Sequence, residues 1–429
     1  MRNTKYFKGK NITIVGLARS GVSCANLLHG LGSCVRVTDI KDNAKTRAYA
    51  ASLSSKDILV ELGLHSESFI KQADLVVISP GVPADAQPVI WASKFGKPVY
   101  AEIEIASMLC PAEIIAVTGS NGKTTVTTLI GRILEESGRK VFVCGNIGKA
   151  FSAEVEKMRE GDFVALEVSS FQLEQIKDFK PKIALIINLT PNHLDRYNNM
   201  QEYLAAKNRI FMNQDKNDFL ILNGLDPLLK GLDKEAASKP IFFAKEQGLN
   251  PNQCAVLKVG EILGIDKEKM LDVFSKFKGI EHRLEEVAVI DKVKFINDSK
   301  ATTADSAIWA LNSISSPVIL IAGGRHKGID YRVILEAARD KVKQAVLIGE
   351  AKDKIAADLN GAFPIEKAGS LEEAINKAYS FSRPGFSVLF SPMCSSFDMF
   401  ADYEDRGRAF KRIVLNLATE ASINNEHIG

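Results

Sequence analysis

Short apolar runs rich in β-branched residues alternate with amphipathic stretches along the whole chain. This alternation is typical of parallel α/β sheets, in which helices cover both faces of buried strands. The sequence therefore predicts an α/β fold, with helices such as Thr124–Ser137 and Leu371–Phe381 between most of the strands. The expected strands are Asn11–Val15, Val35–Asp39, Leu75–Ser79, Ile114–Thr118, Val141–Cys144, Phe163–Val168, Ile183–Asn188, Lys294–Asn297, Val318–Ala322, Ala345–Ile348 and Ser387–Phe390.

The chain is long enough for several domains. At roughly 150 residues per domain, 429 residues correspond to about three. The first unit holds three strand signals and ends near Lys97-Pro98, and the second begins with its own strand and glycine loop and ends near Lys278-Gly279. We expect domains over residues 1–98, 99–279 and 280–429.

The composition excludes several classes of partner. Lys+Arg 55 against Asp+Glu 52 leaves a net charge of +3, which is too near neutral for a nucleic-acid surface. No apolar run approaches the roughly 18 residues that a membrane span needs. The six cysteines are scattered without a C-x-x-C pair, which indicates a reducing compartment. We expect a cytoplasmic protein with neither a nucleic-acid nor a membrane partner.

The strongest local signal is a strand that runs into a glycine loop and a helix at Ile114–Thr125. In this arrangement backbone N–H groups and a helix N-terminus converge on an anion. Lys123 can reach the outer phosphates of a nucleotide, and the Thr124 hydroxyl can bind Mg²⁺. The loop is shorter than the standard P-loop, because Val117 stands where that loop has its first glycine. The alternative is an ordinary strand-to-helix turn. The predicted phosphate-binding residues are Gly119, Ser120, Asn121, Gly122, Lys123, Thr124 and Thr125.

Three residues after this loop could complete a metal site. Glu167 lies near the end of a buried-type strand, where an acidic residue can hold Mg²⁺ beside the phosphates. His193 follows the carboxyl end of another strand, where α/β folds bind ligands. Lys207 shares a helix face with Tyr203. Each residue taken alone is more often solvated or structural, so only their combination favours a site.

The N-terminal unit contains a dinucleotide-type turn, Gly16–Gly21, after its first strand. Asp39 ends the next strand 23 residues after Gly16, where a ribose-binding carboxylate would lie. Ala18 replaces the middle glycine, which weakens the prediction of a nicotinamide dinucleotide site but leaves a nucleotide diphosphate site reasonable. The turn at Ser79–Pro83 could face the same crevice, or it could be a bare loop.

Polar loops follow three strands of the C-terminal unit, at residues 297–302, 323–330 and 391–398. Loops at the ends of strands commonly carry binding residues, so together they predict a binding rim. Cys394 lies in the last of these loops with no adjacent histidine, which makes a thiol nucleophile a remote alternative.

The combination of motifs resembles the Mur ligases, a family of ATP-dependent amide-forming enzymes of peptidoglycan synthesis. The resemblance spans essentially the whole length and includes S-S-F-Q-L and the loop S-P-M-C-S-S-F-D-M-F-x-D-Y-x-x-R-G, which are similar to the D-glutamate-adding branch of the family. The motifs that carry it lie at Val117–Thr125, Leu166–Leu173, Asn192–Tyr197, Tyr203–Lys207, His282-Arg283, Asn297–Thr302 and Ser391–Gly407.

This resemblance implies a Rossmann-like N-terminal domain, a central P-loop ATPase-type domain with a parallel sheet, and a Rossmann-like C-terminal domain. It implies a monomeric ligase that uses ATP and two Mg²⁺ ions to add D-glutamate to UDP-N-acetylmuramoyl-L-alanine through an acyl phosphate. The catalytic residues would be Lys123, Glu167, His193 and Lys207. The metal ligands would be Thr124, Glu167, His193 and Lys207, with Lys207 as a carbamate.

The resemblance also assigns the remaining binding residues. ATP would contact Asn252, Arg283 and Asp298 in addition to the glycine loop. The substrates would contact Ser20, Gly21, Asp39, Gly81, Asn146, Ser169, Thr302, Lys327, Ser396, Phe397 and Tyr403.

One segment departs from the family pattern. Between Asn223 and Gly264 the family has a longer β-hairpin region and an H-N-x-x-N motif before a helix, whereas this chain is short there. Asn252 keeps the place of the second asparagine, but Leu249 occupies the first. The contacts to adenine are therefore the least certain part of the predicted site.

Three alternative functions remain open at the level of the sequence. The nearest is a sister ligase that adds L-lysine, diaminopimelate or a dipeptide, or a folate-type polyglutamate ligase, and the loop at Ser391–Gly407 argues against it. A nucleotide-binding switch leaves Glu167, His193 and Lys207 unexplained. A nicotinamide oxidoreductase depends on the N-terminal turn alone.

Overall fold

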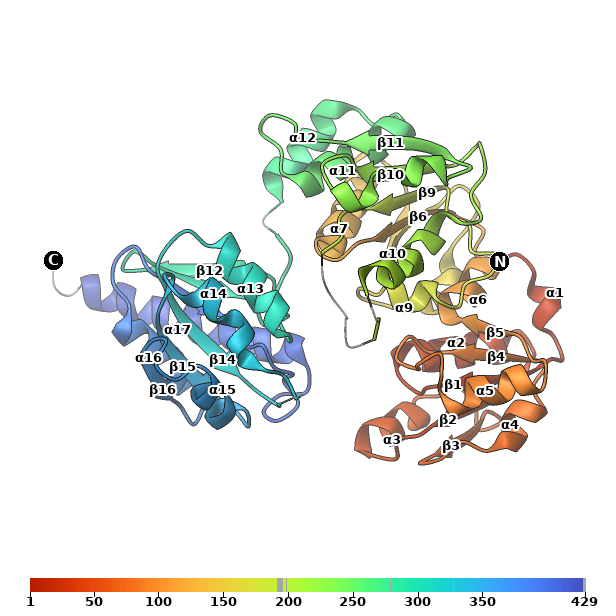
Figure 1. The fold of residues 1–429 in the computed structure, drawn as a ribbon, viewed down its shortest axis with the longest axis horizontal. Coiled ribbons are helices and arrows are strands. Elements are labelled where there is room, and N and C mark those ends of the chain that lie inside the picture. The colour runs from red at the N-terminus through yellow and green to blue at the C-terminus, as the bar shows by residue number, and fades with distance from the viewer. Residues whose placement is uncertain (191–195, 198, 278, 327, 427–429) are drawn as a thin grey trace. The chain divides into compact units, whose positions relative to one another are not determined.

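The computed structural model describes residues 1–190, 196–197, 199–277, 279–326 and 328–426. The chain divides into two compact units, Met1–Phe277 and Lys278–Gly429. The first unit contains two β-sheets and the second contains one, each with helices packed on its faces (Figure 1).

The N-terminal sheet is parallel throughout and has the strand order β3-β2-β1-β4-β5. The order reverses direction between β1 and β4, and in open α/β sheets the ligand crevice lies at such a switch point, beyond the carboxyl ends of the strands. The strands are β1 Asn11–Val15, β2 Cys34–Asp39, β3 Leu59–Leu62, β4 Leu75–Ile78 and β5 Val99–Ala101, and the helices are α1 Thr4–Phe7, α2 Arg19–Gly30, α3 Ala44–Ala51, α4 Glu67–Lys71 and α5 Gln87–Lys94.

The second sheet follows the connecting helix α6, Glu102–Leu109, and is also parallel throughout, with the order β11-β10-β9-β6-β8-β7. Strand β6 lies in the interior of this sheet, so the loop that follows it emerges between the ends of β9 and β8. The strands are β6 Glu113–Thr118, β7 Val141–Gly145, β8 Phe163–Glu167, β9 Ile183–Ile186, β10 Phe219–Asn223 and β11 Lys239–Phe243, and the helices are α7 Lys123–Glu136, α8 Phe151–Glu154, α9 Ser170–Leu173, α10 Met200–Asn208, α11 Pro251–Leu263 and α12 Lys267–Lys276, with 3₁₀ turns η1 Val155–Lys157, η2 Arg209–Phe211, η3 Pro227–Leu229 and η4 Leu232–Lys234.

The second unit is built on a mixed sheet with the order β12-β13-β17-β14-β15-β16. Strands β12 and β13 form an antiparallel hairpin, and the other neighbours are parallel. The strands are β12 Glu285–Ile290, β13 Val293–Asn297, β14 Val318–Gly323, β15 Val342–Ile348, β16 Ile365–Lys367 and β17 Ser387–Phe390, and the helices are α13 Ala304–Ser313, α14 Leu335–Ala338, α15 Lys352–Asp358, α16 Leu371–Phe381 and α17 Tyr403–Glu426, with the 3₁₀ turn η5 Tyr331–Ile334.

Apolar cores lie on both faces of the central strands. In β14, Leu320 packs into the core on one face, while Ile319 and Ile321 pack into the core on the other. In β6, Ala116 and Val117 divide in the same way between two cores. Burial on both faces explains why these strands appear in the sequence as continuous apolar runs.

The predicted α/β fold is confirmed, and each expected strand is present, with some ends shifted. The sequence showed three strand signals within residues 1–98, whereas the N-terminal sheet has five strands, because it also includes β3 and β5. The boundaries near residues 98 and 279 stay predictions. The strands that the sequence analysis missed are β3, β5, β10, β11, β12 and β16.

Candidate active site

The glycine loop between β6 and α7 has a conformation that requires glycine at two positions. Gly119 has a φ of 151°, and a Cβ there would lie 2.5 Å from Cγ1 of Ile187. Gly122 has a φ of 81° in the left-handed region and caps the N-terminus of α7. Because a glycine pays no steric penalty at positive φ, the loop can curve tightly around the end of a 14-residue helix. The N–H groups at this helix end are suited to bind phosphate oxygens.

The loop is held in place by residues that the sequence analysis did not identify. Asn188 Oδ1 accepts hydrogen bonds from the backbone N–H groups of Ser120 and Asn121, at 3.1 and 2.8 Å, and its Nδ2 donates to Asn121 O at 2.9 Å. Thr190 N donates to Ser120 Oγ at 2.9 Å. The only sequence signal for this role was the position of Asn188 two residues after β9, which pairs with β6.

Two lysines converge on one carbonyl of the loop. The Nζ atoms of Lys123 and Lys207 each donate to Gly119 O at 3.0 Å. Lys207 is almost fully buried, and its Nζ lies 4.5 Å from the centre of the Tyr203 ring. Burial, and after it the positive charge of Lys123, lowers the pKa of Lys207 well below its usual range. Lys207 is therefore not the solvated helix lysine that its residue type alone suggests.

Glu167, at the end of β8, offers a carboxylate oxygen to a ligand. The residue is 2% exposed, and its Oε1 accepts a hydrogen bond from Asn146 Nδ2 at 2.8 Å. Its Oε2 is buried and has no hydrogen-bond partner among the described residues. Strand pairing places Glu167 opposite Val117, two residues before the glycine loop. A hard oxygen ligand in this position, with the Thr124 hydroxyl at the start of α7, fits Mg²⁺.

No group of three or more His, Cys, Asp and Glu side chains that could hold a metal is found in the described part of the chain. A Mg²⁺ site does not need such a group, because this ion usually binds one or two carboxylates together with phosphates and water. The predicted ligand His193 lies outside the described residues.

A cavity of about 650 Å³ extends from the N-terminal turn to the end of β7. Its lining includes four of the predicted substrate residues, Ser20, Asp39, Gly81 and Asn146. Gly21 is not among the described lining residues, and a Cβ there would lie 2.1 Å from Gly16 O. Gly21 therefore allows α2 to pack closely on the turn, which is the role of the third glycine in the dinucleotide motif.

The carboxylate of Asp39 fixes the loops around this cavity. Its Oδ2 accepts a hydrogen bond from Leu17 N at 2.7 Å and its Oδ1 accepts one from Lys41 N at 2.8 Å. Ser79 Oγ donates to Gly16 O at 2.9 Å, which joins the turn after β4 to the turn after β1. The predicted residue Ser169 caps α9, and its partner Gln172 lines the cavity.

The short segment before α11 brings one predicted ATP residue to the glycine loop. A Cβ at Gly122 would lie 2.5 Å from Asn252 Oδ1, so the Asn252 amide packs directly against the loop. Leu249, which stands at the place of the missing asparagine, packs against the apolar core around α7 and α11. Asn250 begins α11 with a capping box that includes Gln253.

The rim of the second unit joins the loops that follow β13, β17 and β14, which are neighbours in its sheet. Met393 N donates to Ala301 O, and Arg325 N donates to Ser395 O, both at 2.9 Å. These loops contain three of the predicted substrate residues, Thr302, Ser396 and Phe397. Tyr403 is the first residue of α17. Lys327 lies outside the described residues.

Asp298 lies at the end of β13 and is buried. Its Oδ2 accepts a hydrogen bond from Ser391 Oγ at 2.8 Å, and its Oδ1 accepts one from Leu284 N at 3.3 Å. Burial is the main cause that raises the pKa of Asp298 to about 7, while Ser391 and Arg283 act in the opposite direction. The guanidinium of Arg283 lies 5.8 Å from the centre of the Trp309 ring.

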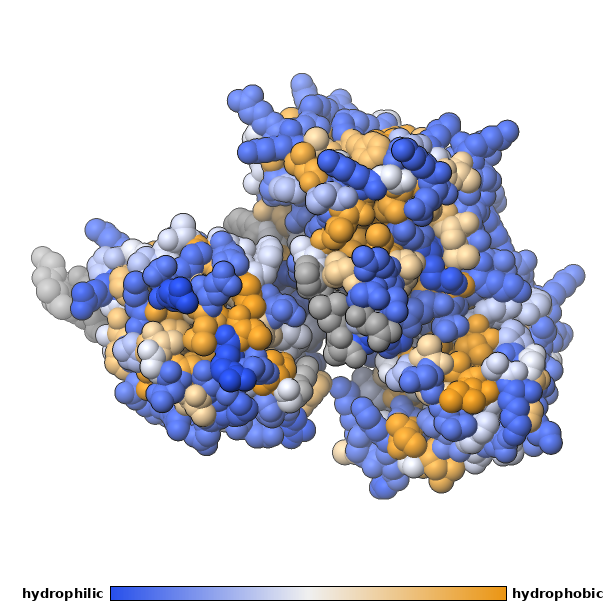
Figure 2. Space-filling model, in the orientation of Figure 1, coloured by the Kyte–Doolittle hydropathy of each residue, from blue (hydrophilic) through white to orange (hydrophobic). Residues whose placement is uncertain are grey.

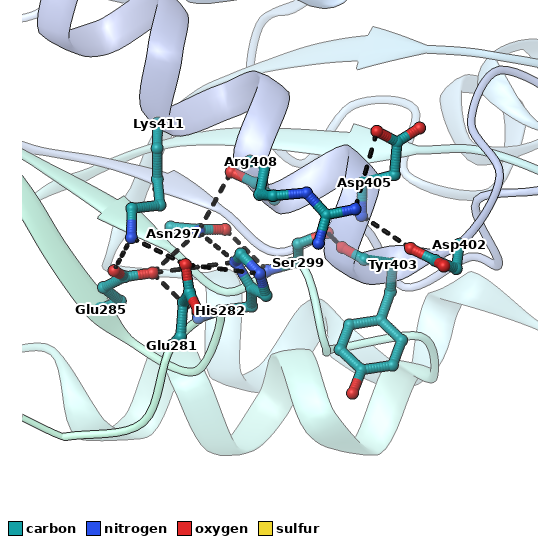
Figure 3. A network of polar contacts seen from close by, with 11 residues as sticks. Glu281, His282, Glu285, Asn297, Ser299, Asp402, Tyr403, Asp405, Arg408 and Lys411 are labelled. Atoms are coloured by element: carbon teal, nitrogen blue, oxygen red, sulfur yellow. Dashed lines mark hydrogen bonds and ion pairs between the residues drawn. The ribbon is translucent and has the colours of Figure 1, made fainter. Parts of the chain in front are cut away.

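Two buried cationic or titratable groups in the second unit were not assigned from the sequence. Arg406 is 1% exposed and donates to Ser299 O at 2.9 Å and to Cys394 O at 3.1 Å, so it ties two rim loops together. His282 lies in the network of Figure 3, where its Nδ1 is 2.9 Å from Asn297 Nδ2. The sequence signal for His282 was its place in the motif H-R, and the signal for Arg406 was its place in the motif D-Y-x-x-R-G.

Three family models match the chain. These are the Mur ligase MurD-like N-terminal domain at residues 10–101, the Mur ligase middle domain at residues 117–291 and the Mur ligase glutamate ligase domain at residues 282–394. A UDP-N-acetylmuramoylalanine–D-glutamate ligase of Geotalea daltonii is 39% identical over 445 residues, which cover 96% of this chain and 98% of the relative. The chain belongs to the Mur ligase family. A protein of the same name from Koribacter versatilis is also 39% identical, over 96% of this chain and 99% of its own length.

Solved structures of Mur ligases share the fold. The UDP-N-acetylmuramate-alanine ligase of Thermotoga maritima has a TM-score of 0.59 at 19% identity and covers 95% of this chain and 99% of its own. The MurF ligase of the same organism, in complex with ADP, has a TM-score of 0.57 at 14% identity and covers 97% of this chain and 98% of its own. The three-domain α/β architecture expected from the sequence is therefore that of the Mur ligases.

Membership of the Mur ligases makes the chain a ligase, so the alternatives of a nicotinamide oxidoreductase and a non-catalytic switch are wrong. Among the described residues, no helix is both long and apolar enough to span a bilayer. Hydrophilic residues cover most of the visible face of the molecule, and apolar residues gather in separate patches (Figure 2).

Proposed function

We propose that this Mur ligase adds D-glutamate to UDP-N-acetylmuramoyl-L-alanine, using ATP, in the synthesis of peptidoglycan precursors. The observation that carries the proposal is the cavity that ends at Asn146, whose side chain is bonded to Glu167 beside the glycine loop. A nucleotide sugar in this cavity would have its reacting end near the phosphates of ATP. The names of the relatives support the choice of D-glutamate.

The reaction requires activation, because a carboxylate does not react with an amine at neutral pH. The alanyl carboxylate attacks the γ-phosphorus of ATP, which forms an acyl phosphate and releases ADP. The amine of D-glutamate then attacks the acyl carbon, and phosphate leaves from the tetrahedral intermediate as the amide forms. One ATP is therefore converted to ADP and phosphate for each amide bond.

The glycine loop and Lys123 hold the phosphates of ATP in this proposal. The N–H groups at the start of α7 and the Lys123 ammonium oppose the negative charge of the phosphoryl groups. Thr124, Glu167, His193 and Lys207 would hold Mg²⁺. When bound, this ion would neutralise charge on the transferred phosphoryl group and orient it.

We infer that Lys207 becomes a carbamate. Its buried position and lowered pKa favour the uncharged amine, which is the form that adds to CO₂. The addition forms an N–C bond and releases one proton, so the side chain gains one negative charge. A negative group is compatible with a neighbouring cation such as Lys123, whereas an ammonium is not.

The amino-acid site belongs to the second unit in this proposal. Lys327 would match a carboxylate of D-glutamate, and the polar rim residues would hold its remaining groups. Arg283 and Asp298 would contact ATP. We also expect a monomeric, cytoplasmic enzyme. The residues that would hold D-glutamate are Thr302, Lys327, Ser396, Phe397 and Tyr403.

Transfer of an oxygen isotope tests the acyl-phosphate step. UDP-N-acetylmuramoyl-L-alanine carrying ¹⁸O at both oxygens of the alanyl carboxylate is incubated with ATP, Mg²⁺ and D-glutamate, and the released phosphate is analysed by mass spectrometry. The proposal predicts one ¹⁸O atom in each phosphate, because the bridging oxygen comes from the carboxylate. Unlabelled phosphate with normal formation of the amide would contradict it.

A further inference from the structure

Asn146 connects the 650 Å³ cavity with the buried carboxylate of Glu167. It lies directly after β7, lines the 650 Å³ cavity and is exposed to solvent there. Its Nδ2 donates to Oε1 of the buried Glu167 at 2.8 Å. Its backbone N donates to Glu167 O at 2.9 Å, so the main chain and the side chain of Asn146 both contact the same residue.

The local backbone holds this contact in place. Gly145 pairs with Glu167 between β7 and β8, and a Cβ at Gly145 would lie 2.4 Å from Glu167 O. Gly145 also has a φ of 104°, which turns the chain sharply before Asn146. The close approach of the two strands therefore leaves the Asn146 amide next to the carboxylate.

The hydrogen bond to Oε1 leaves the other carboxylate oxygen for a ligand. Glu167 Oε2 is buried without a hydrogen-bond partner among the described residues, and a buried carboxylate oxygen in that state favours binding a cation. Groups that hydrogen-bond a metal ligand fix its orientation, and their loss typically weakens metal binding 10- to 100-fold.

We propose that Asn146 is a positioning residue that couples the occupancy of the nucleotide-sugar cavity to the metal affinity of Glu167. This inference rests on the proposed function. A nucleotide sugar in the cavity contacts the exposed part of the Asn146 amide and restricts its rotation, which holds Glu167 in the orientation that binds metal. The coupling is reciprocal, so the metal tightens the binding of the nucleotide sugar by the same factor.

Mn²⁺ affinity measured by electron paramagnetic resonance tests the proposal. Mn²⁺ is titrated into the full chain with bound ADP, and the signal of free Mn²⁺ gives the affinity with and without UDP-N-acetylmuramoyl-L-alanine. For the wild type we expect the nucleotide sugar to tighten Mn²⁺ binding at least fivefold. For Asn146→Ala we expect Mn²⁺ affinity to fall about 10-fold or more and this tightening to disappear.

Gln172→Ala is the matched control. Gln172 also lines the cavity, but its side-chain oxygen Oε1 accepts hydrogen bonds from the backbone N and the Oγ of Ser169. We expect this variant to keep the wild-type Mn²⁺ affinity. Asn146→Leu keeps the approximate shape of the side chain without the donor, and we expect it to behave like Asn146→Ala. Thermal unfolding verifies that each variant is folded.

Two results would overturn the proposal. One is a wild-type Mn²⁺ affinity in both Asn146 variants. The other is a nucleotide sugar that still tightens Mn²⁺ binding in these variants. If the proposed function is wrong, the result differs from the one that overturns only the role of Asn146. In that case the wild type neither binds UDP-N-acetylmuramoyl-L-alanine nor releases phosphate with D-glutamate, whereas an active ligase with uncoupled sites contradicts only the role of Asn146.

Discussion

Lys123 and Lys207 show how the surroundings of a residue change its chemistry. Both Nζ atoms donate to Gly119 O, but Lys207 is almost fully buried, and burial lowers its pKa. The sequence alone favoured a solvated lysine at position 207. Only the resemblance to the Mur ligases indicated a role, because burial depends on contacts with Thr118 and Gly119, which are distant in sequence.

We predict that Lys207→Ala lowers ligase activity about 100-fold and that formate or acetate restores part of it. A short carboxylate can enter the space of the lost side chain and replace the negative charge of the carbamate. The measurement is the rate of phosphate release with increasing concentrations of each acid.

Lys123→Ala is the matched control for this rescue. It removes a positive charge from the same loop, so a carboxylate cannot replace the lost group, and the variant should stay inactive at every acid concentration. Full activity of Lys207→Ala without added acid would refute the carbamate.

The raised pKa of Asp298 leads us to predict that the free energy of unfolding of the second unit depends on pH. Its pKa is raised from 3.8 to about 7 in the folded chain. Between these values the folded state keeps a proton that the unfolded state has lost, so the free energy of unfolding decreases as the pH rises. The decrease is at most about 1.4 kcal/mol per pH unit, and it ends above about pH 7. Asp298→Asn cannot titrate and should remove this decrease.

Urea unfolding followed by the fluorescence of Trp309 measures this effect. Trp91, the other tryptophan of the chain, lies in the first unit, so a Trp91→Phe background leaves a signal from the second unit. The free energies of unfolding are compared at pH 5 and pH 8 with and without Asp298→Asn. An equal difference between the two pH values in both proteins would show that Asp298 does not titrate in this range.

At the scale of elements, the glycine loop depends on the strand beside it. Asn188 follows β9 and binds the backbone of Ser120 and Asn121 through both ends of its amide. We predict that Asn188→Ala weakens ADP binding about 10-fold while the chain stays folded, because the loop N–H groups lose their fixed orientation. Titration calorimetry with ADP measures the change.

Asn223→Ala is the control for this effect. Asn223 ends the neighbouring strand β10, donates to Ile187 O at 3.2 Å and accepts from Leu225 N at 3.0 Å, so both of these bonds lie outside the glycine loop. We expect this variant to bind ADP as the wild type does. Equal ADP affinities of the wild type and Asn188→Ala would show that the hydrogen bonds of Asn188 do not orient the glycine loop for binding.

Several of the strands that the sequence predicted are buried on both faces, whereas the predicted edge strand β7 is mostly half-buried. Strands β1, β4, β14 and β17 consist almost wholly of buried residues, which gives a continuous apolar run. Strands β3, β12 and β16 lie at sheet edges and contain only one buried residue, Ile290 of β12, so their apolar signal is weaker. Strand β10 is different, because its apolar core Leu220–Leu222 is buried and could have been predicted.

At the scale of the whole molecule, the predicted site residues are divided between two compact units. The glycine loop, Glu167, Lys207 and the 650 Å³ cavity belong to the first unit, and the rim with Asp298 belongs to the second. The motifs located most of these residues, and several of the motifs lie at the carboxyl ends of buried strands, as at Thr118–Gly119 and Glu167. The bracing residue Asn188 and the bond from Asn146 to Glu167 were not predictable, because they depend on the register between strands.

The choice of amino acid is the central claim at this scale. In the proposed function it depends on the second unit, which carries the residues predicted to hold the amino acid. Phosphate release is therefore measured with ATP, Mg²⁺ and UDP-N-acetylmuramoyl-L-alanine, with D-glutamate, L-glutamate, L-lysine or diaminopimelate added separately. We predict release that requires both the nucleotide sugar and D-glutamate. Release with another amino acid, and none with D-glutamate, would contradict the account.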